Sequence, residues 1–143
     1  MRIRLTRRDI PGRLATGAFI LHAGLDKWNG PIEQAEAVHG MAASAFPFLK
    51  SIPPDRFLRL LAASEVATGA LLLSPFVSGA VAGTALTGFS GSLLAMYART
   101  PAFRKPGSIW PTQAGTAVSK DVWMLGIGLG LLAGARTRDV AAS

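Results

Sequence analysis

Apolar stretches alternate along the chain with short polar and proline-rich segments. Four such stretches cover residues 10–25, 57–73, 77–98 and 117–135. Between Leu60 and Ala98 the only charged residue is Glu65, and one bilayer span needs only about 20 apolar residues. A Ser-Pro pair at 74–75 divides this run, which indicates two helices joined by a tight turn. The pattern predicts an all-α fold: a polytopic bundle of four transmembrane helices in one membrane domain, residues 1–143.

A shorter segment, from Pro31 to Phe46, predicts an amphipathic helix that does not span the bilayer. Its apolar side chains share one stripe at helical spacing, while acidic residues lie off that stripe. An Asn-Gly-Pro turn signal precedes it, and prolines at 47, 53 and 54 interrupt the chain after it. We expect this helix, between the first and second spans, to lie at the membrane interface or to fold over the bundle.

Composition and charge agree with a membrane protein. Half of the residues are hydrophobic and 16% are charged, against roughly 25% in soluble domains. The net charge is +7, but five arginines fall within the first thirteen positions, directly beside an apolar stretch. Residues placed in this way anchor on lipid headgroups. A basic face interleaved with aromatic residues is absent, so we expect the lipid bilayer as a partner and no nucleic acid.

The absence of cysteine limits the chemistry that this chain could perform. It excludes disulfides, thiolate metal sites and a dithiol relay, so a redox role would need a bound quinone or a partner chain. The segment at residues 6–10 is similar to a twin-arginine signal, but three later apolar stretches favour a signal-anchor helix. The first helix usually sets orientation, so we expect a multi-pass membrane protein with both termini in the cytoplasm; the family resemblance described below implies the bacterial inner membrane.

Small residues recur every fourth position in the last two apolar stretches. Such stripes let helix backbones approach each other in lipid, where no hydrophobic force drives association. They predict helix contacts either within the bundle or with another copy or another membrane protein. The predicted packing glycines are Gly79, Gly83, Gly91, Gly126, Gly130 and Gly134.

Glu65 is the most informative polar residue. An ionisable group about eight residues into a membrane helix is costly, and by default it marks a functional site. Glu65 is predicted either to accept a proton or contact a quinone headgroup, or to pair internally with Arg59, His22 or Arg13. Arg13 lies inside the first apolar stretch, and we expect its guanidinium to snorkel to the membrane surface.

Three further residues complete the predicted ligand site around Glu65. His22 and Asp26 are one helical turn apart, and imidazole titrates near neutral pH, which suits a proton relay or a quinone contact. The alternative for His22 is a buried ring bonded to a carbonyl or to Glu65. Asp26 lies at a helix end, where it either anchors the interface or pairs with the 120–121 segment. Trp123 is predicted either as an interfacial aromatic or as a ring that stacks on a quinone.

Other site classes find little support. The two histidines and Glu65 have no ligand spacing, so no metal site is predicted. Signatures of serine hydrolases, zinc proteases, P-loop proteins and dinucleotide-binding folds are absent. Catalytic residues therefore remain unknown, and no covalent cofactor is implied.

With its segments in register, the chain resembles the DoxX family of four-helix bacterial membrane proteins. The first helix is similar in Arg13, Gly17, Gly24 and Lys27; the second in Glu65, Gly69 and Leu71 to Leu73; and the last in its opening segment, residues 120–126. The resemblance implies a small membrane subunit, since some members belong to thiosulfate:quinone oxidoreductases and others to membrane-associated redox or detoxification complexes. Many relatives carry a histidine near the end of the third helix, whereas this chain reads Met-Tyr-Ala-Arg at 96–99.

These observations leave three functional hypotheses. The first is a subunit that is not catalytic alone, that binds a quinone or similar lipophilic molecule and that associates with a redox complex. The second is an accessory or structural subunit that packs on other chains through its glycine stripes. The third is a small transporter or channel, for which inverted repeats or broken helices would be the signal, and neither is visible.

Overall fold

The computed structural model describes residues 4–142, with side chains as far as Thr137. This part of the chain is helical, and its only β-type pairing is an isolated bridge between Arg104 and Pro111. The all-α prediction is therefore confirmed. The elements are α1 (Ile10–Trp28), α2 (Ile32–Ala45), η1 (Pro47–Ser51), α3 (Pro54–Leu73), α4 (Gly79–Arg99), η2 (Pro101–Phe103), α5 (Thr116–Ser119) and α6 (Asp121–Ala142).

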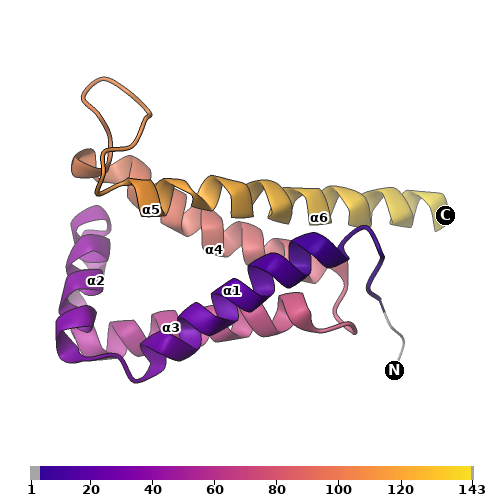
Figure 1. Ribbon diagram of the computed structural model, residues 1–143, viewed down its shortest axis with the longest axis horizontal. Coiled ribbons are helices and arrows are strands. Elements are labelled where there is room, and N and C mark those ends of the chain that lie inside the picture. The colour runs from indigo at the N-terminus through magenta and orange to yellow at the C-terminus, as the bar shows by residue number, and fades with distance from the viewer. Residues whose placement is uncertain (1–3, 143) are drawn as a thin grey trace.

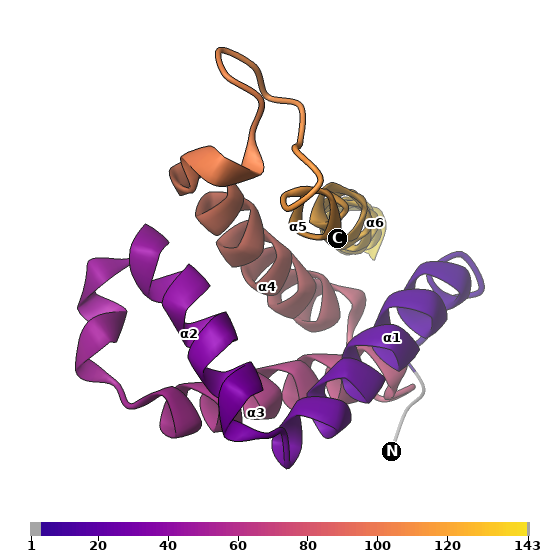
Figure 2. The ribbon, with the colours of Figure 1, turned by 60° about the vertical axis from the view of Figure 1, so that its left-hand side comes forward.

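The long helices form two pairs, α1 with α3 and α4 with α6 (Figure 1). The pairs approach each other near the turn between α3 and α4 and diverge toward the opposite end (Figures 1 and 2). At that open end α2 runs across the bundle and contacts both α3 and α4. This is the place expected for the helix at 31–46, folded over the bundle.

Two helical segments are long and apolar enough to cross a membrane. They are Gly79–Arg99, which is α4, and Thr116–Thr137, which runs through α5 and most of α6. Only 28% and 22% of their apolar windows are buried inside the protein, unlike the core helices of soluble domains. The protein thus has the features of a membrane protein in these two helices. Among the described residues, α1 and α3 do not meet the same criterion, so the four-span bundle remains a prediction.

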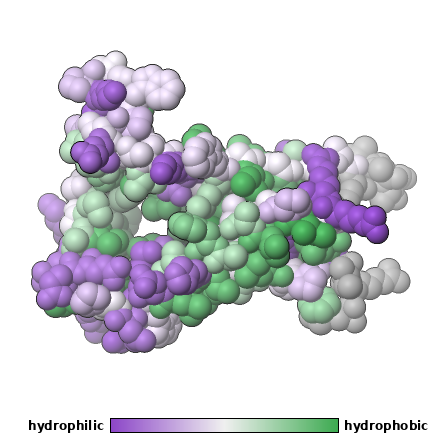
Figure 3. Space-filling model, viewed as in Figure 1, coloured by the Kyte–Doolittle hydropathy of each residue, from purple (hydrophilic) through white to green (hydrophobic). Residues whose placement is uncertain are grey.

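The surface carries a wide apolar band between two more polar ends (Figure 3). One small cluster of buried apolar side chains lies at the core and consists of Ile20, Leu72, Ala82, Leu86 and Leu131. All three tryptophans are exposed: Trp28 ends α1, Trp110 lies in the loop after α4, and Trp123 lies in the first turn of α6. These three positions fall at the end that α2 crosses (Figure 1), an arrangement typical of a membrane–water interface.

The closest helix contacts depend on glycines that the sequence analysis assigned elsewhere or left out. A Cβ on Gly69 of α3 would lie 2.7 Å from the backbone nitrogen of Leu21, and a Cβ on Gly24 of α1 would lie 2.8 Å from that of Val66. Real side chains do not tolerate such distances, so α1 and α3 touch backbone to backbone. Small residues allow this approach in lipid.

In the second pair, only part of the predicted stripe makes such contacts. A Cβ on Gly83 of α4 would lie 2.9 Å from the carbonyl oxygen of Gly128 on α6. Gly79 is buried, and the nearest atom to a Cβ on Gly134 is the guanidinium carbon of Arg8, 4.0 Å away. By contrast, a Cβ on each of three predicted packing glycines would meet no atom within 4 Å: Gly91, Gly126 and Gly130.

Arg13 does not snorkel, contrary to expectation. Its side chain is 1% exposed, and its guanidinium donates four hydrogen bonds to carbonyl oxygens. The acceptors belong to Leu71 and Leu72 in the last turn of α3, and to Ser74 and Val77 in the following turn, at 2.7–3.0 Å. Carbonyls at a helix C-terminus lack helical partners. Arg13 satisfies them and fixes α1 to the α3–α4 turn.

Candidate functional site

An apolar groove lies beneath α2 and η1, where the two helix pairs diverge. It has a volume of about 630 Å³ and is open on one side. Its residues come from α2, η1 and the segment between them (Ala42, Phe46, Phe48, Leu49), from α3 (Phe57, Leu61) and from α4 (Thr87, Gly88, Gly91, Ser92, Leu93, Ala95, Met96). Small-molecule sites typically measure about 300–1,000 Å³ and are mostly apolar. The groove therefore has the size and lining of a binding site for an apolar molecule.

The α4 side of the groove is built from small residues. Gly88 and Gly91 lie one turn apart, and a Cβ on either would meet no atom within 4 Å. The backbone of α4 is thus open to the groove along a full turn. Ser92 does not offer its proton to a ligand, because its hydroxyl donates to the carbonyl of Gly88 at 2.7 Å.

The opposite side carries aromatic rings held in place by contacts around α2. Phe46 and Phe48 have ring centroids 6.0 Å apart, and the Arg99 guanidinium lies 5.1 Å from the centroid of Phe46. This cation–π contact joins the end of α4 to the end of α2. His39 of α2 packs edge-on against Phe57 at 5.4 Å, and its Nε2 lies 2.9 Å from the carbonyl oxygen of Leu49 in η1.

Thr87 supplies the polar feature of the groove lining. Its Oγ1 is buried and has no hydrogen-bond partner in the described structure. A Cβ on Gly128 would lie 2.6 Å from this oxygen, so the hydroxyl lies against α6. An unpaired buried hydroxyl costs about 1–3 kcal/mol, and this one, buried against α6, is not presented to the groove.

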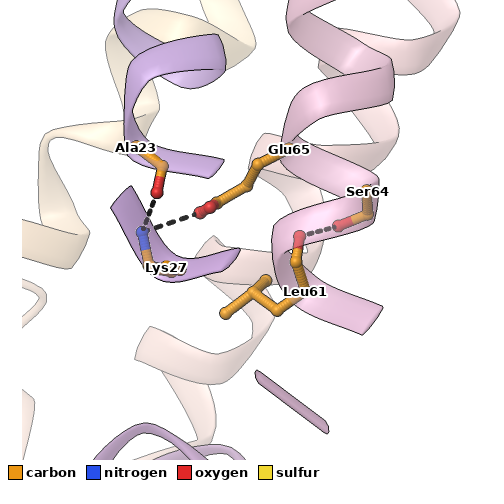
Figure 4. Close-up of polar contacts among 5 residues, drawn as sticks. All are labelled: Ala23, Lys27, Leu61, Ser64 and Glu65. Carbon is orange, nitrogen blue, oxygen red and sulfur yellow. Dashed lines mark hydrogen bonds and ion pairs between the residues drawn. The ribbon is translucent and has the colours of Figure 1, made fainter. Parts of the chain in front are cut away.

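Glu65, the central residue of the predicted ligand site, does not line the groove. Its carboxylate points from α3 toward α1, where Oε1 lies 3.2 Å from the Nζ of Lys27 (Figure 4). Lys27 also donates to the carbonyl of Ala23 at 3.3 Å. The internal partner is therefore Lys27, in place of the expected Arg59, His22 or Arg13. Glu65 Oε2 is buried without a hydrogen-bond partner in the described structure. The carboxylate of Asp121 on α6 is near enough for the two negative charges to repel each other.

The other predicted ligand residues do not gather around Glu65. The side chains of His22 and Asp26 are exposed on α1, and no hydrogen bond joins them in the described structure. Trp123 is 68% exposed on α6. Of the pockets described above and below, none is lined by more than one of Glu65, His22, Asp26 and Trp123. Among the described residues, no group of three His, Cys, Asp or Glu could hold a metal ion.

Comparison with known proteins adds no family assignment. The chain matches no protein-family model, no curated protein and no solved structure. The DoxX resemblance therefore stays a prediction.

Sequence reasoning missed the groove, although signals for it exist. Gly91 belongs to the stripe that was assigned to packing, and together with Gly88, Ser92 and Ala95 it forms a surface of small residues on α4. Two phenylalanines, at 46 and 48, lie at the end of the segment that was predicted to fold over the bundle, and a third, at 57, begins the second apolar stretch. The sequence does not indicate how far apart α3 and α4 lie. This distance decides whether the surface of small residues forms a groove or a contact between helices.

Proposed function

We propose that this chain is a multi-pass membrane protein that binds a lipophilic molecule, such as a quinone, in the groove beneath α2. The observation that carries the proposal is the open backbone of α4 at Gly88 and Gly91, opposite the aromatic rings. In a bilayer, a helix surface without side chains leaves a space that an acyl tail, an isoprenoid tail or an aromatic headgroup can occupy.

We assign the chain a binding role and not a catalytic one. The groove lining includes no carboxylate, lysine, arginine or histidine side chain. Chemistry on a bound quinone would then belong to a partner in a redox complex, which is the role that the DoxX resemblance implies. Glu65 is assigned to the contact between α1 and α3, because its ion pair is with Lys27 and its Cβ packs against Gly24.

The proposed topology is four crossings with both termini on the cytoplasmic side of a bacterial inner membrane. In support, the described parts of both termini lie at the same end of the molecule (Figure 1), as an even number of crossings requires. The exposed Leu14, Phe19 and Leu60 on α1 and α3 also extend the apolar surface beyond the two most apolar helices.

The test fills the groove without disturbing the fold. Gly91→Leu and Gly88→Leu each place a side chain in open space, and leucine favours a helix by up to about 1 kcal/mol over glycine. We expect unchanged helicity and an unfolding midpoint that is unchanged or higher. Binding of a decyl-substituted benzoquinone, measured by titration calorimetry in detergent, should weaken at least about tenfold, a loss of roughly 1.4 kcal/mol.

Gly126→Leu is the matched control, because a Cβ at this position also meets no atom within 4 Å and Gly126 lies outside the groove lining. Its affinity for the benzoquinone should equal that of the unmodified protein. Equal affinity of all three variants, or equal loss in all three, would contradict binding in the groove. Mass spectrometry of organic extracts from each variant would show whether a native lipophilic molecule is lost in parallel.

A second candidate function, an accessory subunit, is favoured by the outward face of α6. Gly126 and Gly130 lie one turn apart with open space above them, beside the exposed Trp123 and Leu129. Exposed small residues at this spacing are typical of contacts between membrane helices. If Gly130→Leu separates the protein from a second copy or a copurified chain while benzoquinone binding is unchanged, α6 serves assembly.

A further inference from the structure

The loop between α4 and α6 projects from the bundle as a small hairpin, visible at the top of Figure 1. Its two arms pair through the Arg104–Pro111 bridge and a hydrogen bond from Lys105 N to the carbonyl of Trp110, 2.9 Å long. Gly107 makes the turn at the tip with a φ of 65°, a conformation that favours glycine. The hairpin exposes Ile109 and Trp110 strongly, at 77% and 67%.

The base of the hairpin is fixed to the helices. The Tyr97 hydroxyl of α4 donates to the carbonyl of Ile109 at 2.7 Å, and the Tyr97 ring stacks on Phe103 at 6.4 Å. Thr112 Oγ1 donates to the carbonyl of Ala102 at 2.7 Å. A Cβ on Gly115 would clash with the Phe103 backbone, so the two arms touch there. The apolar tip is therefore held in one position by the fold.

A second apolar cleft of about 400 Å³ lies between this hairpin and the start of α6. Its main lining residues are Tyr97, Ile109, Trp110, Lys120, Val122 and Trp123. The cleft lies at the end of the molecule that carries all three tryptophans, where the chain would meet lipid headgroups. The rings of Trp110 and Trp123 are amphipathic, and the ammonium group of Lys120 is cationic, so the cleft lining offers both kinds of contact.

The charged residues of the loop are all positive, and the acidic Asp121 that follows it at the start of α6 does not line the cleft. Residues 99–120 contain four basic residues (Arg99, Arg104, Lys105, Lys120) and no acidic residue. Arg99 is engaged with Phe46, and Lys120 is the one basic residue that lines the cleft. Lys105 lies on the other side of the hairpin, away from the cleft lining. A ligand with a negative headgroup and an apolar tail complements this combination.

We propose that this cleft binds one anionic phospholipid, with its phosphate at Lys120 and an acyl chain along Val122 and Trp123. Lys120 supplies the charge, and the tryptophan rings lie at the depth where headgroup and acyl chain meet. The apolar lining distinguishes a lipid from a free phosphate. The site is separate from the groove beneath α2, so it requires membrane insertion but not quinone binding.

The test uses the tryptophans as reporters. Trp28→Phe leaves Trp110 and Trp123, both in the cleft lining, as the only tryptophans. This variant is reconstituted in vesicles of equal parts phosphatidylglycerol and phosphatidylcholine, with brominated acyl chains on one lipid or the other. One lysine near an anionic headgroup contributes about 1 kcal/mol, so quenching should report about fivefold enrichment of phosphatidylglycerol over phosphatidylcholine.

Three variants at two lysines, made in this background, locate the effect. Lys120→Gln should abolish the preference for phosphatidylglycerol, Lys120→Arg should keep it, and Lys105→Gln should leave it unchanged. Equal quenching by both lipids in the parent protein would overturn the proposal. An equal loss in Lys105→Gln and Lys120→Gln would also overturn it, by showing a diffuse basic surface, and so would loss of the preference on adding inorganic phosphate. Because none of these measurements involves a quinone, they fail or succeed independently of the groove.

Discussion

The ion pair between Lys27 and Glu65 allows a double-mutant cycle that decides whether Glu65 is a packing residue. Its two side chains are largely buried, with 20% of Lys27 and 8% of Glu65 exposed. The proposed changes are Lys27→Met and Glu65→Gln, alone and together. Each keeps the approximate size of the side chain, so the tight contact of Glu65 with Gly24 is preserved.

The structure sets the size of the expected effect. Two unit charges 3.2 Å apart attract each other by about 5 kcal/mol at an effective dielectric constant of 20. The partial exposure of Lys27 screens this attraction, so we expect a coupling energy of about 2 kcal/mol, because the desolvation cost of each ion cancels in the cycle. Lys27→Met should be the costlier single change, at about 3 kcal/mol, because it leaves a buried carboxylate without its counter-charge.

Glu65→Gln should cost less, about 1–2 kcal/mol, because Lys27 keeps its hydrogen bond to the carbonyl of Ala23. The assay is unfolding by increasing SDS in mixed micelles, followed by far-UV circular dichroism. Asp26→Asn, on the exposed face of the same helix turn, is the matched control and should leave the midpoint unchanged. If the stability losses of the two single variants add up to that of the double variant within about 0.5 kcal/mol, the ion pair does not stabilise the fold. Glu65 would then again be a candidate functional residue.

Three further predictions concern stability; the first and third use the same unfolding assay. Arg13→Met should cost about 3–5 kcal/mol, because four carbonyls lose their donor, and Arg13→Lys should recover only part of this. Gly69→Leu should prevent stable folding, judged by monodispersity in detergent, whereas Gly126→Leu should fold normally, because only Gly69 lies against a neighbouring backbone. Thr87→Val should stabilise the ligand-free protein by about 1 kcal/mol by removing an unpaired buried hydroxyl, and a lower midpoint would contradict that reading.

The positions of the helices could be predicted because their signals are local. Apolar length marks the bodies of α1, α3, α4 and α6, and turn residues such as Ser74 and Pro75 mark their ends. The start of the last helix was less clear, since the chain makes the short α5 at 116–119 before α6 begins at Asp121. The polar Ser-Lys-Asp segment at this junction is compatible with the start of a helix and with the interior of one. The sequence alone therefore does not show that α5 and α6 are separate helices.

The candidate site could not be predicted, because it depends on how each helix is rotated. His22 and Asp26 do share one face of α1, as their spacing implies. Lys27 lies five residues after His22, about 140° around the helix, and this rotation takes it to the α3 side. The glycines indicate the same side, since Gly24 is three residues before Lys27 and packs on α3. The spacing of Gly24 and Lys27 was therefore the available signal for the contact face.

The glycines of α4 show why a small-residue stripe has no fixed meaning. Gly83 contacts α6, whereas Gly91, two turns later on the same stripe, opens into the groove. The difference arises because the helix pairs converge near the α3–α4 turn and diverge where α2 crosses (Figure 1). Arg13 fixes the convergent end by holding α1 to the turn, and α2 with its Phe46–Arg99 contact bridges the divergent end. The width of the groove is thus set by contacts at both ends of α4, and substitutions at Gly88 or Gly91 can change its volume without altering either of them.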